Sequence, residues 1–223
     1  MGNVKIGEWI SEAWSIISED LVTHIILALI VGLGSSITGG ILSGPLMGGY
    51  LWIIFNKMKN PSYKPEVGDV GKGFEQFVQL LLVGIVGGLI ASLGTIACVI
   101  GVFFTSALVI LAIPLVVERK LGFWEAITES ISRTKPDLMG WVVFVLVIGL
   151  LNAVGGAVAV GFLITLPIAV VMIAIGYRDV VGLQGAAAGG AAAAPTAPAA
   201  SEPAAPTAPP TPSDDSSDDT YTS

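Results

Sequence analysis

The sequence contains few of the residues from which catalytic and metal sites are built, and little charge of either sign. Only 12% of its 223 residues are charged, against about 25% in an average soluble protein. It has one histidine and one cysteine. The lone cysteine, Cys98, excludes an internal disulfide and a zinc ribbon. HExxH, P-loop and GxSxG patterns are also missing, so we predict that the chain is not an enzyme and holds no metal or cofactor.

Apolar residues are in excess. They make up 53% of the chain, and the mean hydropathy is +0.83. A soluble domain of this size cannot bury so much apolar surface, so the expected solvent is a lipid bilayer. The first residues, MGNVKIGEWISEAW, lack the basic segment, apolar core and cleavage site of a signal peptide. We therefore expect the transmembrane segments themselves to drive insertion.

Three long apolar blocks cover residues 21–58, 77–117 and 138–177. Each is about twice the ~20 residues that one helical span of a bilayer requires, and each has an uncharged, glycine-containing middle. The runs are continuous, whereas strands of a membrane barrel would alternate polar and apolar residues. The sequence therefore predicts an all-α membrane protein with six transmembrane helices, arranged as three hairpins.

The positions of the basic residues predict the orientation. None of the 10 lysines and arginines lies in the middle of a hairpin. With six spans they all fall on one side, which the positive-inside rule identifies as the cytoplasm. We expect a multi-pass protein of the bacterial inner membrane with both termini in the cytoplasm.

A short amphipathic segment precedes each block. Such tryptophan-bearing helices are expected to lie in the headgroup region, and Trp9, Trp14, Trp52, Trp124 and Trp141 all map to this interface. The membrane domain, residues 1–182, then divides into units of residues 1–58, 59–117 and 118–182, which reflect either a parallel repeat or chance similarity. The apolar positions are Val4, Ile6, Trp9, Ile10, Ala13, Trp14 and Ile17, then Val67, Val70, Phe74 and Phe77, then Leu121, Trp124, Ile127 and Ile131.

The composition changes at the C-terminus. Residues 183–223 are rich in alanine and proline and contain five acidic residues, in a chain of net charge −7. Such a segment cannot form a packed core, so we predict a disordered acidic tail. It either keeps the chain soluble or is available to a soluble partner.

Several motifs resemble a family. GPLMGGY at residues 44–50, with Lys57 and Asn60 and then GDVGKGFEQF at residues 68–77, is similar to a superfamily of bacterial polytopic inner-membrane proteins. So are PLVVER at residues 114–119 and FWEAI at residues 123–127, with Ser130. The superfamily includes the membrane domain of some glycerophosphodiester phosphodiesterases and several uncharacterised families. The resemblance implies a six-helix membrane module; it carries over no enzymatic activity, because the phosphodiesterase barrel is absent.

Polar residues give few catalytic candidates. His24 follows Asp20 by four residues, so the two are expected to form a polar pair at the cytoplasmic mouth of the first span. No acidic residue lies deep in a span, which argues against proton or sodium coupling. Pro45, Pro114 and Pro167, one in each second arm, mark either packed kinks or the broken helices of a transport path.

Two sets of residues are candidates for packing and binding. Glycines at four-residue spacing favour close helix contacts, within the chain or in a homo-oligomer. Basic residues beside the amphipathic segments are expected to contact anionic headgroups or to act only as topological anchors. On the third segment Glu129 and Arg133 are spaced to pair. The glycines are Gly40, Gly44, Gly48, Gly84 and Gly88, and the basic residues are Lys57, Lys59, Arg119, Lys120, Arg133 and Lys135.

Together these patterns favour a non-catalytic membrane scaffold or a module that binds lipid or a protein partner in the membrane or cytoplasm. The alternative is a channel or transporter for small neutral or amphiphilic solutes. We expect no nucleic-acid partner.

Cysteine-accessibility mapping tests the predicted topology. With Cys98 replaced by alanine, a cysteine placed between Lys59 and Lys72 should react with a membrane-impermeant reagent only in permeabilised cells, because this loop is expected in the cytoplasm. Labelling of that cysteine in intact cells would contradict six spans.

Overall fold

The fold was derived from a computed structural model that describes residues 4–97, 101–157 and 161–184. These residues form helices and connecting turns, with no strand among them, which confirms the predicted all-helical architecture. Residues 185–223 of the predicted tail lie outside the described residues. The elements are α1 (Ile6–Glu19), α2 (Leu21–Ile37), α3 (Ser43–Lys59), the 3₁₀ helix η1 (Val67–Gln76), α4 (Phe77–Ala97), α5 (Gly101–Val109), α6 (Ala112–Arg119), α7 (Phe123–Thr134), the 3₁₀ helix η2 (Lys135–Asp137), α8 (Leu138–Ala157) and α9 (Phe162–Val181).

Four helical stretches are long and apolar enough to cross a membrane. They are Val67–Leu93, Gly101–Arg119, Phe123–Ala157 and Phe162–Val181. A fifth candidate is the pair α1 and α2, which meet at an angle of 102°. Helices α2 and α3 have 17 residues each, about 25 Å of helix at 1.5 Å per residue. The number of spans is therefore not fixed by length alone.

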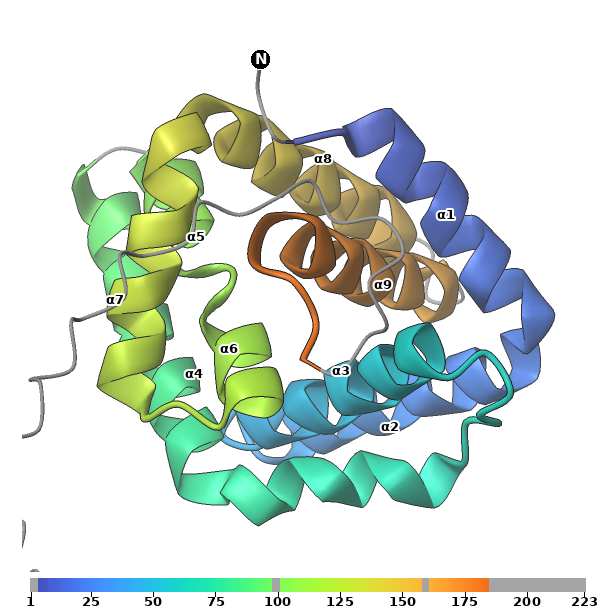
Figure 1. The fold of residues 1–223 in the computed structure, drawn as a ribbon. Helices are drawn as coiled ribbons and strands as arrows, with labels where there is room; N and C mark the ends of the chain where they lie inside the picture. Colours follow the sequence, from blue (N-terminus) through green and yellow to red (C-terminus); the bar gives the residue numbers. More distant parts are fainter. Residues whose placement is uncertain (1–3, 98–100, 158–160, 185–223) are drawn as a thin grey trace, which may run out of the picture. The chain divides into compact units, whose positions relative to one another are not determined.

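The helices divide into an inner and an outer set. Within the described residues, α3, α6 and α9 occupy the middle, and the other helices surround them (Figure 1). Burial follows the same division, because six of the eight residues of α6 are buried, whereas only four of the 20 residues of α8 are. Helices α2, α4 and α8 thus belong to the outer set, and α3, α6 and α9, which come later in the chain than each of them in turn, belong to the inner set.

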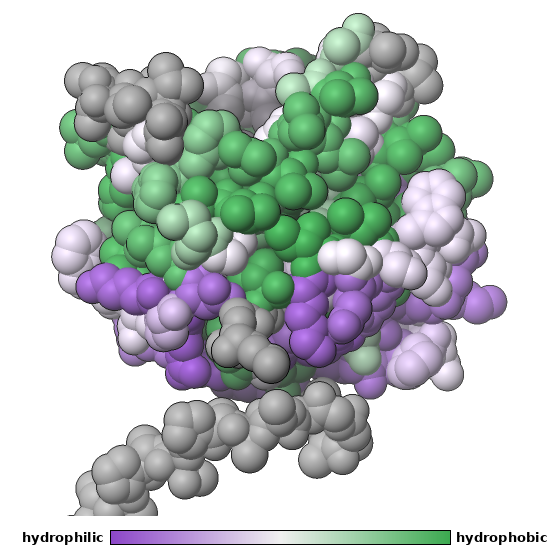
Figure 2. Space-filling view, turned by 90° about the horizontal axis from the view of Figure 1, so that it is seen from above, coloured by the Kyte–Doolittle hydropathy of each residue, from purple (hydrophilic) through white to green (hydrophobic). Residues whose placement is uncertain are grey.

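The outer helices expose apolar side chains. Leu33 of α2, Leu89 of α4 and Leu150 of α8 are 54%, 60% and 62% exposed. Figure 2 shows apolar residues spread over this face of the molecule and hydrophilic residues gathered in a band at one end, which we call the charged end. A surface of this kind is favourable in hydrocarbon and costly in water.

Helix α1 has one apolar face that packs against the protein and another that is exposed. Trp9, Ala13 and Ile17, at spacings of four, are buried, whereas Ile10 and Trp14 are 42% and 50% exposed. The assignment of all five tryptophans to the interface is corrected here. Trp9 and Trp141 are fully buried and form an aromatic cluster with Phe144, in which the two indole centroids lie 5.8 Å apart. Trp14 and Trp124 are exposed, and Trp52 is half-buried.

The amphipathic segment of the second unit is a 3₁₀ helix rather than an α-helix. Its backbone packs directly on the backbone of α3, because a side chain at Gly73 would overlap the carbonyl oxygen of Pro45, and one at Gly49 would overlap that of Val70. Residues i and i+3 eclipse in a 3₁₀ helix, which places Val70 and Gly73 together against α3. Glycine is required at both contact points.

Substitution of Gly49 tests this contact. Gly49→Ala should lower the free energy of unfolding by about 1–3 kcal/mol or more, because the methyl group has no space against backbone atoms. Gly88→Ala is the matched control, because a Cβ there meets nothing within 4 Å. Thermal unfolding in detergent measures both, and an equal effect of the two substitutions would contradict the backbone contact.

Candidate functional site

Each inner helix ends with a basic residue in its last turn at the charged end. These are Lys57 and Lys59 in α3, Arg119 in α6 and Arg178 in α9. Cations in the last turn of a helix interact favourably with the unpaired carbonyls and the negative end of the helix dipole. The sequence therefore brings positive charge to the place where the three inner helices end, and acidic residues are needed to balance it there.

Glu118 of α6 supplies a buried carboxylate in this region. Its side chain is only 4% exposed and lies 2.8 Å from the Lys59 ammonium, and it accepts a hydrogen bond of 2.8 Å from the backbone N–H of Gln184. The next residue, Arg119, donates to the carbonyl of Val181 at 2.9 Å. A buried carboxylate is tolerated when it is paired in this way. Helix α6 thus holds both α3 and the segment that follows α9.

Helix α1 is joined to α9 and α3 by further polar contacts. Arg178 forms a bidentate pair with Glu12 (Nη2 to Oε2, 2.9 Å) and also bonds Asp179. The indole N–H of Trp9 donates to Asp179 at 2.9 Å, and Lys57 pairs with Glu19 at 2.9 Å. These contacts fix α1 across the ends of the inner helices.

Two glutamines hold the turn between α6 and α7. With its amide oriented to satisfy both neighbours, Gln76 donates to the carbonyl of Val116 at 2.8 Å and accepts from Lys120 at 2.7 Å. Gln79 accepts a bond of 2.8 Å from the backbone N–H of Phe123. One glutamine therefore satisfies a carbonyl at the end of α6, and the other an N–H at the start of α7. Lys120 has φ +58°, the one positive value at a non-glycine residue of the described chain.

The inner arm of the second unit is interrupted between α5 and α6. Pro114 lacks an N–H, and its ring crowds the carbonyl of Ile110, so the helix stops at Val109 and resumes at Ala112, with proline in the new first turn. The fully buried hydroxyl of Ser130 accepts from the N–H of Leu111 at 3.2 Å and donates to the carbonyl of Leu108 at 2.7 Å. One side chain of α7 thus satisfies backbone groups on both sides of the break. Pro114 marks a break and not only a kink.

His24 pairs with a different residue from the one predicted. Its Nδ1 lies 2.8 Å from the hydroxyl of Tyr50, and both residues are buried. Asp20 instead caps α2 by accepting from the N–H of Thr23 at 3.3 Å. The hydrogen bonds of the two side chains therefore go to the N-cap of α2 and to Tyr50 of α3, while Asp20 still interacts electrostatically with His24.

The described residues contain no cluster of three histidine, cysteine or acidic side chains that could hold a metal ion.

Most of the basic residues predicted to contact headgroups interact within the protein. Lys57, Lys59 and Arg133 form ion pairs. Arg119 donates to the carbonyl of Val181, and Lys120 donates to Gln76. Lys135 is exposed, and no ion pair is recorded for it in the described part of the chain. The predicted pairing of Arg133 with Glu129 is confirmed, at 2.7 Å.

The predicted packing glycines lie in different environments. A Cβ at Gly44 or Gly48 would meet Leu80 of α4, and one at Gly84 would lie 3.7 Å from Gly44. Gly40 lies in the turn between α2 and α3 with φ +88°, and Gly88 faces open space. Close helix packing in the chain therefore involves Gly44, Gly48 and Gly84.

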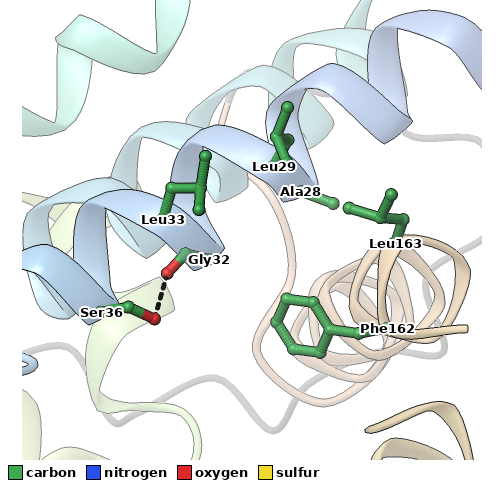
Figure 3. Close-up of a pocket in the computed structure, with 7 residues that line it drawn as sticks. All are labelled: Ala28, Leu29, Gly32, Leu33, Ser36, Phe162 and Leu163. Carbon is green, nitrogen blue, oxygen red and sulfur yellow. Dashed lines mark hydrogen bonds between the residues drawn. The ribbon is translucent and has the colours of Figure 1, made fainter. Parts of the chain in front are cut away.

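Two grooves open on the apolar surface, away from these polar contacts. One, of about 270 Å³, lies between α2 and the start of α9, where Phe162 faces α2 (Figure 3). The other, of about 330 Å³, lies beside Gly84, Gly88 and Ser92 of α4. Ser36 and Ser92 both bond carbonyls of their own helices, so the linings offer few free polar groups. These grooves fit hydrocarbon better than a polar solute.

The loop that follows α3 is fixed by the half-buried phenol of Tyr63. Its hydroxyl donates a hydrogen bond to Asp69 of η1, and its ring packs edge-on against Trp52, with ring centroids 6.3 Å apart. Burial, and then the hydrogen bond to Asp69, raise the pKa of the Tyr63 hydroxyl well above its ordinary value. The phenol therefore remains a donor at all physiological pH values.

The fold defines a class: an all-helical protein in which several helices are apolar enough to cross a membrane. Comparisons with protein-family models, with curated proteins and with solved structures find no match. The family resemblance of the sequence stays a prediction.

A double-mutant cycle tests the buried ion pair. Lys59→Met, Glu118→Gln and the double variant should give a coupling free energy of about 1–3 kcal/mol in unfolding measurements, because Glu118 is almost fully removed from solvent. The Lys72–Glu75 pair, with side chains 45% and 55% exposed, is the control and should show no measurable coupling. Equal coupling in the two pairs would contradict a special role for burial.

Proposed function

We propose that this chain is a non-catalytic, six-span protein of the inner membrane, with both termini in the cytoplasm, that acts as a scaffold or as a module for binding lipid or a protein partner. The observation that carries the proposal is that charged and aromatic side chains at the charged end make different contacts. Most cations there bond groups within the protein, whereas each interfacial element exposes an aromatic side chain. These are Trp14, Phe74 and Trp124, which are 50%, 42% and 63% exposed.

The repeated order of elements supports six spans. In each unit a short helix at the charged end precedes an outer arm and an inner arm, and α2 and α3 hold the positions in their unit that α8 and α9 hold in theirs. Two helices of 17 residues can cross a bilayer whose hydrocarbon thins slightly to match them. The exposed Leu29, Leu33 and Ile37 of α2 would then face lipid, as the outer residues of α4 and α8 do.

The exposed aromatic residues are suited to the membrane interface. Tryptophan and phenylalanine contribute apolar area at the level of the headgroups, and the three side chains come from three separate elements. Among the basic residues, exposed Lys135 is the best placed for an anionic headgroup. Met139, one turn later in the chain, is 64% exposed. This arrangement favours contact with lipid or with another membrane protein over chemistry on a substrate.

A transport function is the second candidate. The break between α5 and α6 favours it, because interrupted helices commonly form the binding sites of transporters. The packed interior argues against it, since Tyr50, Phe55 and Tyr177 fill the space between the inner helices and are at most 1% exposed. Both grooves lie on the apolar surface instead.

Extraction from native membranes, followed by mass spectrometry, tests the binding function. The protein should retain a reproducible set of lipids or a protein partner, and the triple variant Trp14→Ser, Phe74→Ser, Trp124→Ser should lose it, because its interfacial contact area is removed. Leu33→Ala, Leu89→Ala, Leu150→Ala is a matched control that removes apolar area from the outer arms and should retain the same set. Reproducible solute flux in proteoliposomes would contradict the scaffold and support the transporter.

A further inference from the structure

Helix α6 is a short element with a two-residue turn before it and a left-handed residue after it. It comprises eight residues, Ala112–Arg119. The first joint is the break at Ile110 and Leu111, and the second is Lys120, whose φ of +58° is unfavourable for a residue with a side chain. The inner arms α3 and α9 are continuous, although each contains a proline. The second unit alone therefore has an inner arm that can move in two pieces.

Polar side chains hold α6 at both joints. At the first, Ser130 of α7 bonds Leu108 and Leu111 on either side of the break. At the second, Glu118 and Arg119 bond Gln184 and Val181. Between these points Leu115 and Val116 are fully buried in the core. About two turns of helix separate the two sets of bonds.

The segment held by Glu118 and Arg119 is the one from which the acidic tail continues. Gly182, with φ +84°, turns the chain after α9, and Gln184 then meets Glu118.

We propose that α6 is a lever that couples the root of the tail, residues 181–184, to the break in the inner arm of the second unit. When the tail root leaves Glu118, α6 tilts about its joints and the bonds of Ser130 loosen. Loss of the Ser130 bonds has the reverse effect on the tail root, because coupling between two sites is reciprocal. The inference is independent of the proposed function, since it concerns how a signal at the tail would reach the interior.

Hydrogen exchange of the full-length protein in nanodiscs, followed by mass spectrometry, tests the lever. Glu118→Met, which removes both acceptor oxygens, should speed exchange of the Gln184 amide and, through α6, of the Leu111 amide, each by about tenfold. Ser130→Ala should speed exchange at the same two amides. Thr134→Val is the matched control, because this buried hydroxyl bonds only Ser130 and Ile131 of its own helix; it should alter neither amide.

The distinguishing result is the effect at the far end. If each variant accelerates only the amide that it contacts directly, the lever is wrong and the two sets of bonds are independent. Unchanged protection of Ala13 and Ile17 in α1 shows that the fold is intact. If Glu118→Met exposes α1 as well, Lys59→Gln, which loosens Glu118 without removing its carboxylate, replaces it, and the same two amides decide the outcome.

Discussion

Glu118 accepts bonds from Lys59 and from the backbone of Gln184 at the point where the three inner helices end. Around it, the cations that conclude α3 and α9 pair with acidic residues of α1, α6 and α9, and Arg119 at the end of α6 donates to a backbone carbonyl. Placing all of this charge at one end leaves the remaining length of each helix free to be apolar. The rest of the fold depends on that separation, because it leaves the outer helices with long apolar surfaces of the kind that a membrane span requires.

A second constraint is the satisfaction of backbone groups within an apolar surrounding. Helices satisfy nearly all of them, and the structure departs from the helix at few places. Where it does, in the second unit, side chains supply the missing partners: Ser130 at the α5–α6 break, and Gln76 and Gln79 at the turn before α7. The first and third units lack such a break in the inner arm. In the described chain both of these irregularities lie in the second unit, one at each end of α6.

Much of the fold could be predicted from the sequence, because the helices follow from long apolar runs and periodic segments. The polar contacts at the charged end could be predicted less well from the sequence. The charges of Lys59 and Arg119 suggest exposure, but their partners come from distant parts of the chain, and no local pattern reveals them. Pro114 signals an interruption, whereas the burial of Ser130 depends on how α7 packs. Glycine-rich residues 67–76 have apolar residues at a spacing that fits either type of helix, and only the close approach of α3 selects the 3₁₀ form.

The central claim is that the three hairpins cross the bilayer in the same way, including the first, whose helices are the shortest. Spin labels at Leu33, Leu89 and Leu150, one on each outer arm, measure this directly through their accessibility to oxygen and to a water-soluble nickel complex in liposomes. The account predicts that all three labels are accessible to oxygen and shielded from nickel. A label at Leu33 that is as accessible to nickel as one on the exposed loop at Ser62 would contradict it.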